Sequence, residues 1–569
     1  MEEFTVEVLS RLGEAAEDGR RTLAAVRAIE GRARGAHEIP LVSELAAGDP
    51  LAATNYLLGE EPLWADLHTG RAIAREADER LRQTVQAILS ARGPKVIVLV
   101  TGTAGSGKST SLMRLALAET AAGRSVGWVD KDSDVPPREV RRSMERRGHP
   151  EILIIDDADG YGPEVASLAR EIASGPEEPL IILGTRSTRA ERIVDPLRQM
   201  GVPIQEEAMP HLTDADIGGL IDVLDRENRL GRLKGLPRRD QERAFREQFG
   251  RQLLVAMLQA TSGRPFEERI VNEMAELRPD EREVYGLISI ATALRHFLTM
   301  DEVLLAVGDA SNATLNTVES LARRLLIVPR AGGAGFGTRH RVIAEVIFNQ
   351  MTADGIAGTP VGRLTFMAAS KVQGIVSRTA RPWRMLRPLL NHDFLLRTIG
   401  PENARDVYTG VEALLHWDYH YLLQRGSLEL EAGDIRLAEN YLNQAYSLGS
   451  DDPLVRTEFA YLLLRLAVEA PTAPGAASRV QNGLAMLEEI IKLRGRLDRY
   501  PYHVLGSQGL AWSRRAALGL RERQSLLKTL SQRVGEGVNN HAGSEELKRL
   551  HEDLKKELMM TAVDYRGED

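Results

Sequence analysis

The sequence of 569 residues contains no cysteine. This absence excludes disulfide bonds, thiolate zinc sites and cysteine nucleophiles, and it is typical of proteins in a reducing cytosol, so we expect a cytoplasmic protein. Long apolar runs are also missing, since none approaches the roughly 20 residues that a membrane-spanning helix needs. The first residues, Met1-Glu2-Glu3, are acidic, unlike a secretory signal. We therefore expect no membrane association.

The sequence also lacks an excess of positive charge. Its formal net charge is −8 at pH 7, which argues against direct binding to nucleic acid because a phosphate backbone attracts basic surfaces. Hydrophobic residues make up 43% and charged residues 27% of the chain, which are the proportions of an ordinary globular protein. At ~150 residues per domain, a chain of this length holds roughly three or four domains.

The strongest motif lies at residues 95–110. Val96 to Val100 is an unbroken apolar run, which predicts a buried parallel strand. The next eight residues, 102–109, fit the phosphate-binding pattern G-x-x-x-x-G-K-[ST] at every fixed position, and an apolar-periodic helix is expected to follow. The residues predicted to surround the nucleotide are Gly102, Thr103, Ala104, Gly105, Ser106, Gly107, Lys108, Ser109 and Thr110.

This spacing serves a specific chemistry. Glycines let the backbone wrap around a phosphate so that several N–H groups point inward, and the following helix directs its positive end at the same anion. Lys108 is expected to reach the β- and γ-phosphates, and the Ser109 hydroxyl to bind Mg²⁺. The motif therefore predicts ATP or ADP, with Mg²⁺, as ligands.

Two further strand ends carry charged residues. Glu151-Ile-Leu-Ile-Ile-Asp156-Asp157 is an apolar run followed by an acidic pair. At this edge of a parallel sheet Asp156 is expected to hold Mg²⁺ and Asp157 to polarise the attacking water, although Asp also favours an ordinary turn. The run from Leu180 to Leu183 leads to Arg186, which is either a catalytic arginine that neutralises the γ-phosphate or a surface residue.

The remaining chain is predicted to be mostly helical. The alternation of strands and helices from 95 to 225 predicts a doubly wound parallel sheet. A single helix is expected at 239–260, and helices near 281–296, 300–307 and 313–325 precede a hairpin at 326–340, which together predict a winged helix. Few basic residues lie in its wing, which argues against DNA reading.

Residues 360–569 have an almost entirely helical pattern. Tyr421 to Asp452 resembles a tetratricopeptide unit, in which Gly426 and the apolar residues at 438, 442 and 445 let two helices pack closely. Less regular units are expected at 454–492 and from Tyr502. The last helix, 545–565, has leucines on one side and is predicted to be solvated or bound to a partner. Such an array stacks helix hairpins into a concave surface.

The order of these motifs resembles the STAND class of signal-transduction ATPases over about residues 60–350. The resemblance implies that Gly263-Arg264-Pro265 is the Gly-x-Pro motif of the class, with Pro265 packed on the adenine; Gly235-Leu236-Pro237 is the competing candidate. It also implies that His340, in the winged helix, contacts the β-phosphate of bound ADP.

These observations predict an α/β P-loop NTPase domain followed by a helical lid, a winged helix and an all-α repeat-like array. The expected domains are an N-terminal helical segment at 1–60, the NTPase domain at 61–225, the lid at 226–279, the winged helix at 280–355 and the array at 356–569.

The resemblance implies a slow ATPase that works as an ATP/ADP-dependent switch in bacterial anti-phage defence or regulation. It would sense a ligand through the array, form a homo-oligomer on activation, and contact a protein ligand or an effector chain. Two alternatives stay open. One is a P-loop enzyme of another class, such as a kinase or a nucleic-acid-dependent ATPase. The other is a scaffold whose nucleotide is structural.

The P-loop assignment predicts the effect of Lys108→Ala. The change removes the P-loop ammonium expected at the terminal phosphates, and a charge-assisted contact is worth ~1.5–3 kcal/mol. We expect the affinity for ATP to fall at least about tenfold, measured by calorimetry. An unchanged affinity would contradict the assignment.

Overall fold

The computed structural model describes residues 39–47, 56–91, 96–129, 140–144, 149–161, 163–173, 179–262, 266–308, 312–329, 335–373, 378, 380–496, 498–541 and 543–567. The chain divides into two compact units, Met1–Phe266 and Glu267–Asp569, and this division lies inside the segment predicted to be the lid. Residues 1–38, most of the basic segment 131–148 and the motif Gly263-Arg264-Pro265 lie outside the described residues.

The first unit is built on a five-stranded parallel sheet with the order β2-β3-β4-β1-β5. Its strands are β1 (Ile97–Gly102), β2 (Val126–Val129), β3 (Ile152–Ile155), β4 (Leu180–Arg186) and β5 (Ile204–Ala208). Its main helices are α4 (Glu76–Ser90), α5 (Lys108–Ala121), α7 (Pro163–Ala173), α8 (Glu191–Gln199) and α9 (Asp214–Arg226). The predicted parallel α/β fold is therefore confirmed.

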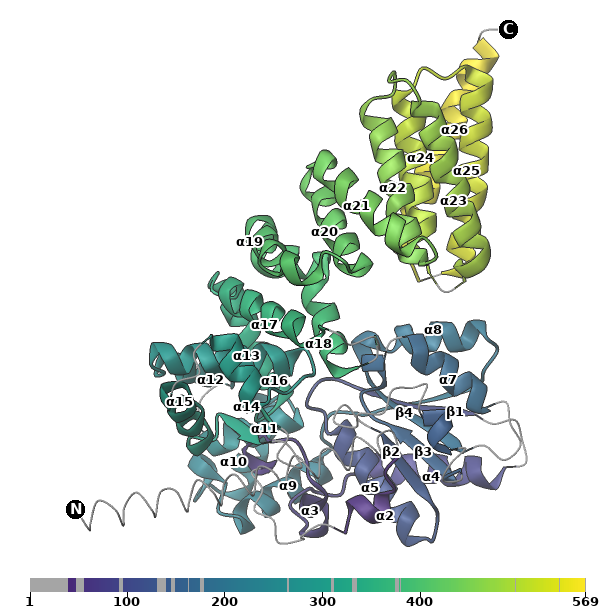
Figure 1. Cartoon of the computed structure of the whole chain (residues 1–569). Helices are drawn as coiled ribbons and strands as arrows, with labels where there is room; N and C mark the ends of the chain where they lie inside the picture. Colours follow the sequence, from purple (N-terminus) through teal and green to yellow (C-terminus); the bar gives the residue numbers. More distant parts are fainter. Residues whose placement is uncertain are drawn as a thin grey trace, which may run out of the picture. The chain divides into compact units, whose positions relative to one another are not determined.

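Successive residues of β4 face opposite sides of the sheet, as in any strand. Leu183 lies in the core that Val165 of α7 and Leu197 of α8 also form. A side chain at Gly184, the next residue, would instead meet Leu112 of α5. The sheet is thus covered on both faces, which explains why its inner strands are continuous apolar runs (Figure 1).

The segment before the P-loop adds to the edge of this sheet. Leu41 forms an antiparallel bridge with Gly127 of β2, and the Trp128 amide donates to the Pro40 carbonyl at 3.0 Å. Further along, Trp64 of α3 (Trp64–His68) packs edge-on against Trp128, with ring centroids 5.3 Å apart. Residues 39–41, although predicted to be part of an N-terminal segment, are therefore paired with the sheet.

The single helix predicted at 239–260 is wrong. The structure has α10 (Arg238–Arg243), a π-helical turn (Ala244–Gln248) and α11 (Leu253–Ser262). Gly250 and Arg251 between them have left-handed φ values of 59° and 56°, which no helix contains. The break leaves the Arg251 carbonyl to accept from the Leu212 amide at 2.9 Å. The following helix α9 is capped by Thr213, whose side chain accepts from the Asp216 amide.

The second unit begins with the predicted helices and hairpin. These elements are α12 (Phe266–Ala275), α13 (Pro279–Ala293), α14 (Met300–Val307), α15 (Asn312–Arg323), β6 (Ile327–Pro329), β7 (Phe336–Thr338) and α16 (Arg341–Ala353). β6 and β7 pair antiparallel, and Leu298, ahead of α14, pairs with Phe336. We call residues 279–353 the hairpin domain.

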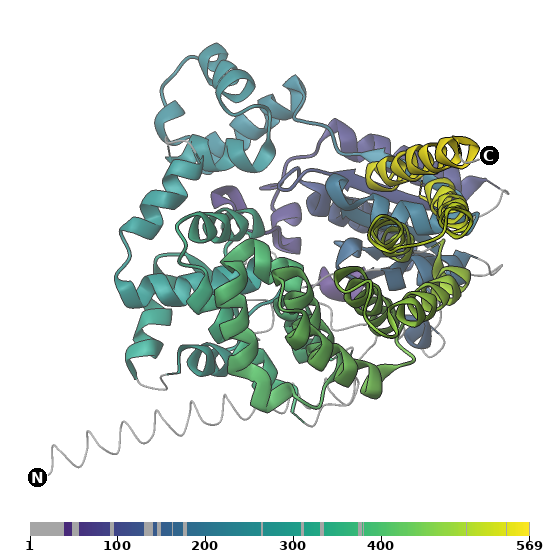
Figure 2. The same ribbon diagram turned by 90° about the horizontal axis from the view of Figure 1, so that it is seen from above.

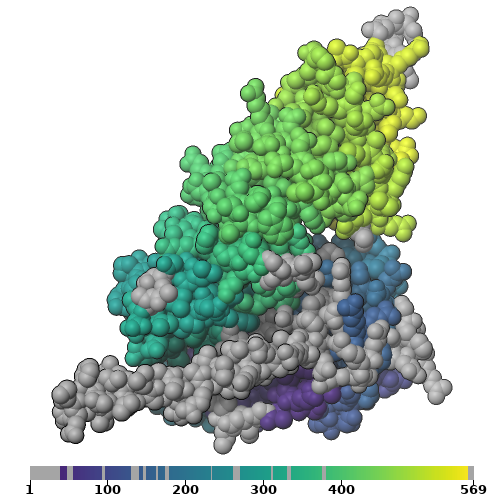
Figure 3. Space-filling model, viewed as in Figure 1, coloured from purple at the N-terminus to yellow at the C-terminus, as the bar shows by residue number. Residues whose placement is uncertain are grey.

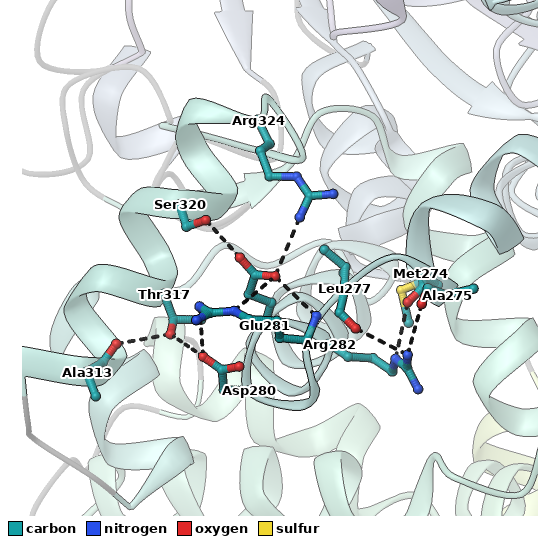
Figure 4. A network of polar contacts seen from close by, with 11 residues as sticks. Met274, Ala275, Leu277, Asp280, Glu281, Arg282, Ala313, Thr317, Ser320 and Arg324 are labelled. Carbon is teal, nitrogen blue, oxygen red and sulfur yellow. Dashed lines mark hydrogen bonds and ion pairs between the residues drawn. The ribbon is translucent and has the colours of Figure 1, made fainter.

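A polar network joins α12, α13 and α15 (Figure 4). Glu281, near the start of α13, accepts from the Ser320 hydroxyl at 2.8 Å and lies 3.5 Å from Arg324. The Ser320 hydrogen bond lowers the pKa of the Glu281 carboxyl. Arg282 donates to three carbonyls at the end of α12, at 3.2–3.3 Å. The Glu281 carboxylate lies in the first turn of α13, and the Arg282 guanidinium binds carbonyls at and just after the C-terminal end of α12. Each charge is therefore favourable for its helix dipole, and the contacts hold α12 against the hairpin domain.

Residues 358–567 form the predicted all-α array. Its helices are α17 (Gly358–Lys371), α18 (Arg381–Leu390), α19 (His392–Leu415, interrupted at Gly400), α20 (Tyr419–Ala432), α21 (Ile435–Gly449), α22 (Pro453–Glu469), α23 (Ala476–Arg494), α24 (Tyr500–Arg515), α25 (Leu520–Asn540) and α26 (Glu545–Gly567). Each packs against the next along a curve (Figure 2), and together they present one continuous surface (Figure 3). Among the described residues, none of the helices is long and apolar enough to cross a bilayer.

Close helix packing in the array depends on glycine. A Cβ at Gly426 of α20 would lie 2.6 Å from Cγ of Leu442 in α21, and Ala438 and Ala445 beside it are fully buried. The close approach predicted for these positions is therefore present. Gly509 makes the same kind of contact, with Leu530 at 2.6 Å.

The prediction that the last helix is solvated or partner-bound is wrong. Leu547 and Leu554 of α26 are completely buried, and Leu550 is nearly so, in a core shared with α24 and α25. The leucine face of α26 is covered by the chain itself. Because Gly506 of α24 has no side chain, Leu550 approaches within 2.8 Å of the position that a Cβ at 506 would take.

Gly426→Ala tests this packing. The added methyl cannot fit between α20 and α21, and overpacking of this kind costs about 1–3 kcal/mol. We expect faster hydrogen exchange of the α20 and α21 amides. Gly410→Ala is the matched control, because Gly410 is also helical but has nothing within 4 Å of its Cβ position. It should be neutral or stabilising by up to about 1 kcal/mol; equal effects of the two changes would contradict the packing argument.

Candidate functional site

The phosphate-binding turn has the backbone that its glycines predict. Gly105 and Gly107 have left-handed φ values of 72° and 88°, and Gly107 caps the N-terminus of α5. A Cβ at Gly102 would lie 2.5 Å from the Ser106 hydroxyl oxygen. The left-handed φ values disfavour side chains at 105 and 107, and a side chain at 102 would collide with Ser106, so the residues fit a cradle for phosphate.

Lys108, Ser109 and Asp156 lie together at the carboxyl edge of the sheet. Lys108 and Asp156 are both buried. Burial raises the pKa of the Asp156 carboxyl, whereas the charge of Lys108 and a hydrogen bond with the Ser109 hydroxyl oppose that rise. A hydroxyl and a carboxylate in contact beside a buried ammonium form the oxygen-donor set expected for Mg²⁺ on a nucleotide.

Room for Asp156 comes from Gly184. β4 lies between β1 and β3, so Gly184 is next to the end of the strand that carries Asp156. A Cβ at Gly184 would stand 2.6 Å from Oδ1 of Asp156 and 2.7 Å from Leu112. The absence of a side chain at 184 therefore lets the carboxylate turn toward α5 and the P-loop. Sequence analysis missed this residue, whose only signal is a glycine inside an apolar strand.

Asp157 differs from Asp156 in exposure and backbone. It is partly exposed, and its φ of 50° lies in the left-handed region, which is uncommon outside glycine. Its amide donates to Oδ1 of Asp156 at 2.9 Å. The turn thus directs the two adjacent carboxylates to different environments, as a division into a metal ligand and a water-polarising group requires. The catalytic role of Asp157 stays a prediction.

Arg186 lies at the same edge of the sheet. Its Cα is the register partner of Gly102, the first residue of the P-loop. Two residues after Gly184 on the same strand, it shares the face that α5 covers. Thr185 belongs to the opposite face, where its buried hydroxyl donates to Asp159 at 3.2 Å. This placement agrees with a phosphate-facing role for Arg186, which also stays a prediction.

Arg75 is a buried residue that sequence analysis missed. Its guanidinium donates to the Ser106 carbonyl at 2.6 Å and to the Pro210 carbonyl at 2.8 Å, and it pairs with Asp216 at 3.3 Å. It therefore ties the P-loop to the segment after β5 and to the first turn of α9. In the sequence Arg75 is one of several charged residues before a helix, and nothing local distinguishes it.

The turn before α11 is the second missed feature. The Leu254 amide donates to the Gly105 carbonyl at 3.2 Å. The side chains of Leu253 and Leu254 stand 2.7 Å from the Cβ positions of Gly107 and Gly105. No such contact with the P-loop is given for either Gly-x-Pro candidate. Gly235 has no neighbour within 4 Å of its Cβ position, and Pro265 lies outside the described residues. The only local signal was Gly250 itself, a glycine inside an otherwise periodic helix pattern.

His340 lies in the second unit and caps α16. Its Nδ1 accepts from the Val342 amide at 3.0 Å. The preceding Arg339 makes a two-pronged ion pair with Glu273 of α12, at 2.8 and 2.9 Å. The cap gives His340 a structural role, and its predicted contact with the β-phosphate of ADP stays a prediction.

Comparison with known families identifies the nucleotide domain. Residues 54–197 match the family model described as Novel STAND NTPase 5. The matched segment contains the P-loop, the acidic pair and Arg186, and it ends within α8. The STAND resemblance is therefore confirmed for residues 54–197, which contain a P-loop NTPase domain of this type. A search of curated proteins finds no match.

Solved structures similar to this chain include three ATPases. The Orc1 protein of Aeropyrum pernix, in complex with DNA, is 14% identical, with 53% of this chain and 96% of that one covered and a TM-score of 0.24. AMPPCP-bound DnaA from Aquifex aeolicus is 12% identical, with coverage of 44% and 90% and a TM-score of 0.22. The RuvB branch migration motor of Thermotoga maritima is 16% identical, with coverage of 47% and 92% and a TM-score of 0.23. At these TM-scores the likeness says nothing about what this chain binds.

Gly184→Ala tests the placement of Asp156. The new methyl would collide with the carboxylate and displace it from Ser109. We expect Mg²⁺-dependent ATP affinity to fall at least about tenfold, while ADP affinity in EDTA changes less. Gly219→Ala in α9, where nothing lies within 4 Å, is the matched control. An unchanged Mg²⁺ dependence in a folded Gly184→Ala protein would show that Asp156 does not need this space.

Proposed function

We propose that this chain is an ATP/ADP-dependent switch that binds ATP with Mg²⁺ and hydrolyses it slowly. The observation that carries the proposal is the group formed by Lys108, Ser109 and Asp156 beneath a glycine turn, with Arg186 at the same edge of the sheet. Support also comes from the STAND match over residues 54–197.

Each residue has a role in this proposal. The amides of the P-loop and Lys108 hold the terminal phosphates, and Ser109 and Asp156 hold Mg²⁺. When bound, Mg²⁺ neutralises charge on the phosphates. Asp157 accepts a hydrogen bond from the attacking water and so orients it. Arg186 neutralises the charge that builds up on the γ-phosphate.

The contact between α11 and the P-loop favours slow exchange. Leu253 and Leu254 pack on the backbone of Gly107 and Gly105, and one backbone hydrogen bond joins the two segments. In this proposal the start of α11 stiffens the loop that holds the phosphates, so release of the nucleotide requires α11 to move. Slow exchange suits a switch whose state is its bound nucleotide, whereas rapid turnover requires an open site.

In this proposal the array receives the signal. A protein ligand or effector chain that prefers the active form would shift the population toward it, and the active chain would form a homo-oligomer. A role in bacterial anti-phage defence or regulation follows from the STAND resemblance. A kinase-like enzyme, a nucleic-acid-dependent ATPase or a scaffold with a structural nucleotide is the alternative.

Asp157→Asn separates binding from hydrolysis. The change keeps the side-chain shape and removes the charge that polarises water, a contribution worth about 10²–10⁴-fold in rate. We expect ATP to bind with nearly unchanged affinity, turnover to fall about a hundredfold or more, and particles in ATP to elute larger from gel filtration than the same protein in ADP.

The combined result distinguishes the candidate functions. Hydrolysis at the wild-type rate would remove Asp157 from the catalytic group. Turnover lost without any difference in size between ATP and ADP would favour an enzyme of another class, and wild-type protein that never exchanges its nucleotide would favour a scaffold.

A further inference from the structure

Three potential metal ligands meet where α19 begins and α20 ends. They are His392 and Asp393, in the first turn of α19, and Glu431, in the last turn of α20. One ligand atom from each residue lies within 4.8 Å of the others, and no other group of this kind is found among the described residues. The two helices pack against one another in the array (Figure 1).

The orientation of the His392 ring is set by Gln424. The Gln424 Oε1 accepts from the backbone amide of His392 at 3.0 Å and lies 2.8 Å from Nδ1 of the ring. A backbone amide can only donate, so the atom of Gln424 at this place is its oxygen, and Nδ1 must carry a proton. Nε2 is then the nitrogen that faces Glu431, at 3.3 Å. Metal-binding histidines are commonly held this way, by an acceptor on the nitrogen away from the ion.

The surroundings carry more negative than positive charge. Asp393 and Glu431 flank the imidazole, and Glu458 of α22 is buried close enough to act on it. Burial lowers the pKa of His392, but Glu431, Gln424 and Glu458 more than offset this and raise that pKa to about 9. Arg397, which is largely exposed, lies 4.0 Å from Asp393. The carboxylates of Asp393 and Glu431 thus each have an oxygen within 4.8 Å of a ring nitrogen of His392, and Glu431 is hydrogen-bonded to the ring.

We propose that His392 Nε2 and the carboxylates of Asp393 and Glu431 bind a divalent transition-metal ion of the zinc type. An imidazole with two carboxylates suits such an ion better than Ca²⁺ or Mg²⁺, which take oxygen ligands alone. The ion replaces the proton on Nε2 and lies between the imidazole and the two carboxylates. It joins the start of α19 to the end of α20 and leaves a coordination position for water.

The experiment is a Zn²⁺ titration of the full chain, freed of metal with EDTA and then kept in excess Mg²⁺ to occupy the nucleotide site. We expect one Zn²⁺ per chain and a rise in melting temperature. His392→Ala and Glu431→Gln should each weaken this binding at least about tenfold. Co²⁺ should give a visible spectrum without thiolate bands, since the chain has no cysteine.

His503→Ala is the matched control. His503 lies 3.3 Å from Glu546, the same histidine–glutamate distance, but it belongs to no three-ligand group among the described residues. It should bind Zn²⁺ as the wild type does. The proposal would be overturned by unchanged Zn²⁺ affinity in His392→Ala, or by an equal loss of Zn²⁺ affinity in His503→Ala. It would also be overturned if the site bound Ca²⁺ with the same affinity in the wild type and in His392→Ala. Glu431→Gln keeps the size of the side chain, so its metal-free melting temperature shows whether folding is intact.

Discussion

The nucleotide domain depends on one buried guanidinium. Arg75 binds the Ser106 carbonyl from outside the P-loop, and it pairs with Asp216, whose other oxygen accepts from the Glu76 amide at 3.2 Å. Because the Ser106 carbonyl is held toward Arg75, the amides of the P-loop are left to point toward the phosphate. Both charged groups are almost completely buried, and removal of one partner of such a pair costs about 3–5 kcal/mol because the other is left unpaired. Loop shape, the segment after β5 and the start of α9 are thus coupled through a single side chain.

The chemistry of the site follows from strand order. Because β4 lies between β1 and β3, its last residues stand beside both the P-loop and the acidic pair. Gly184 gives Asp156 its space, Thr185 turns to the opposite face, and Arg186 follows on the face of α5. Three consecutive residues therefore have three different tasks, each set by the alternation of a strand. A shift of one residue in this register would exchange Arg186 for a buried threonine at the phosphate edge.

The sequence predicts features that are local and misses those that join distant segments. The P-loop, the acidic pair and the apolar strands that lead to the P-loop, to the acidic pair and to Arg186 all follow from contiguous patterns. Arg75 could not be recognised, because its partner Asp216 is 141 residues away. The turn at Gly250 was hidden inside an apolar-periodic helix pattern, and its φ values are set by contacts with Leu212 and the P-loop. For the same reason the leucines of α26 suggested an open face, although α24 and α25 cover them.

The junction between the hairpin domain and the array has a bearing on any switch. Arg381 of α18 makes a two-pronged ion pair with Glu302 of α14, at 2.6 and 2.8 Å, and stacks on Phe297. Lys371 with Asp301 and Arg363 with Glu283 add two further pairs. The latter two involve partly exposed groups, and pairs open to solvent contribute about 0–1 kcal/mol each. Glu302 is buried, so separating it from Arg381 would leave a charge without its partner. In the proposed switch, a ligand that displaces α18 would therefore have to carry α14 with it or break the buried Arg381–Glu302 pair.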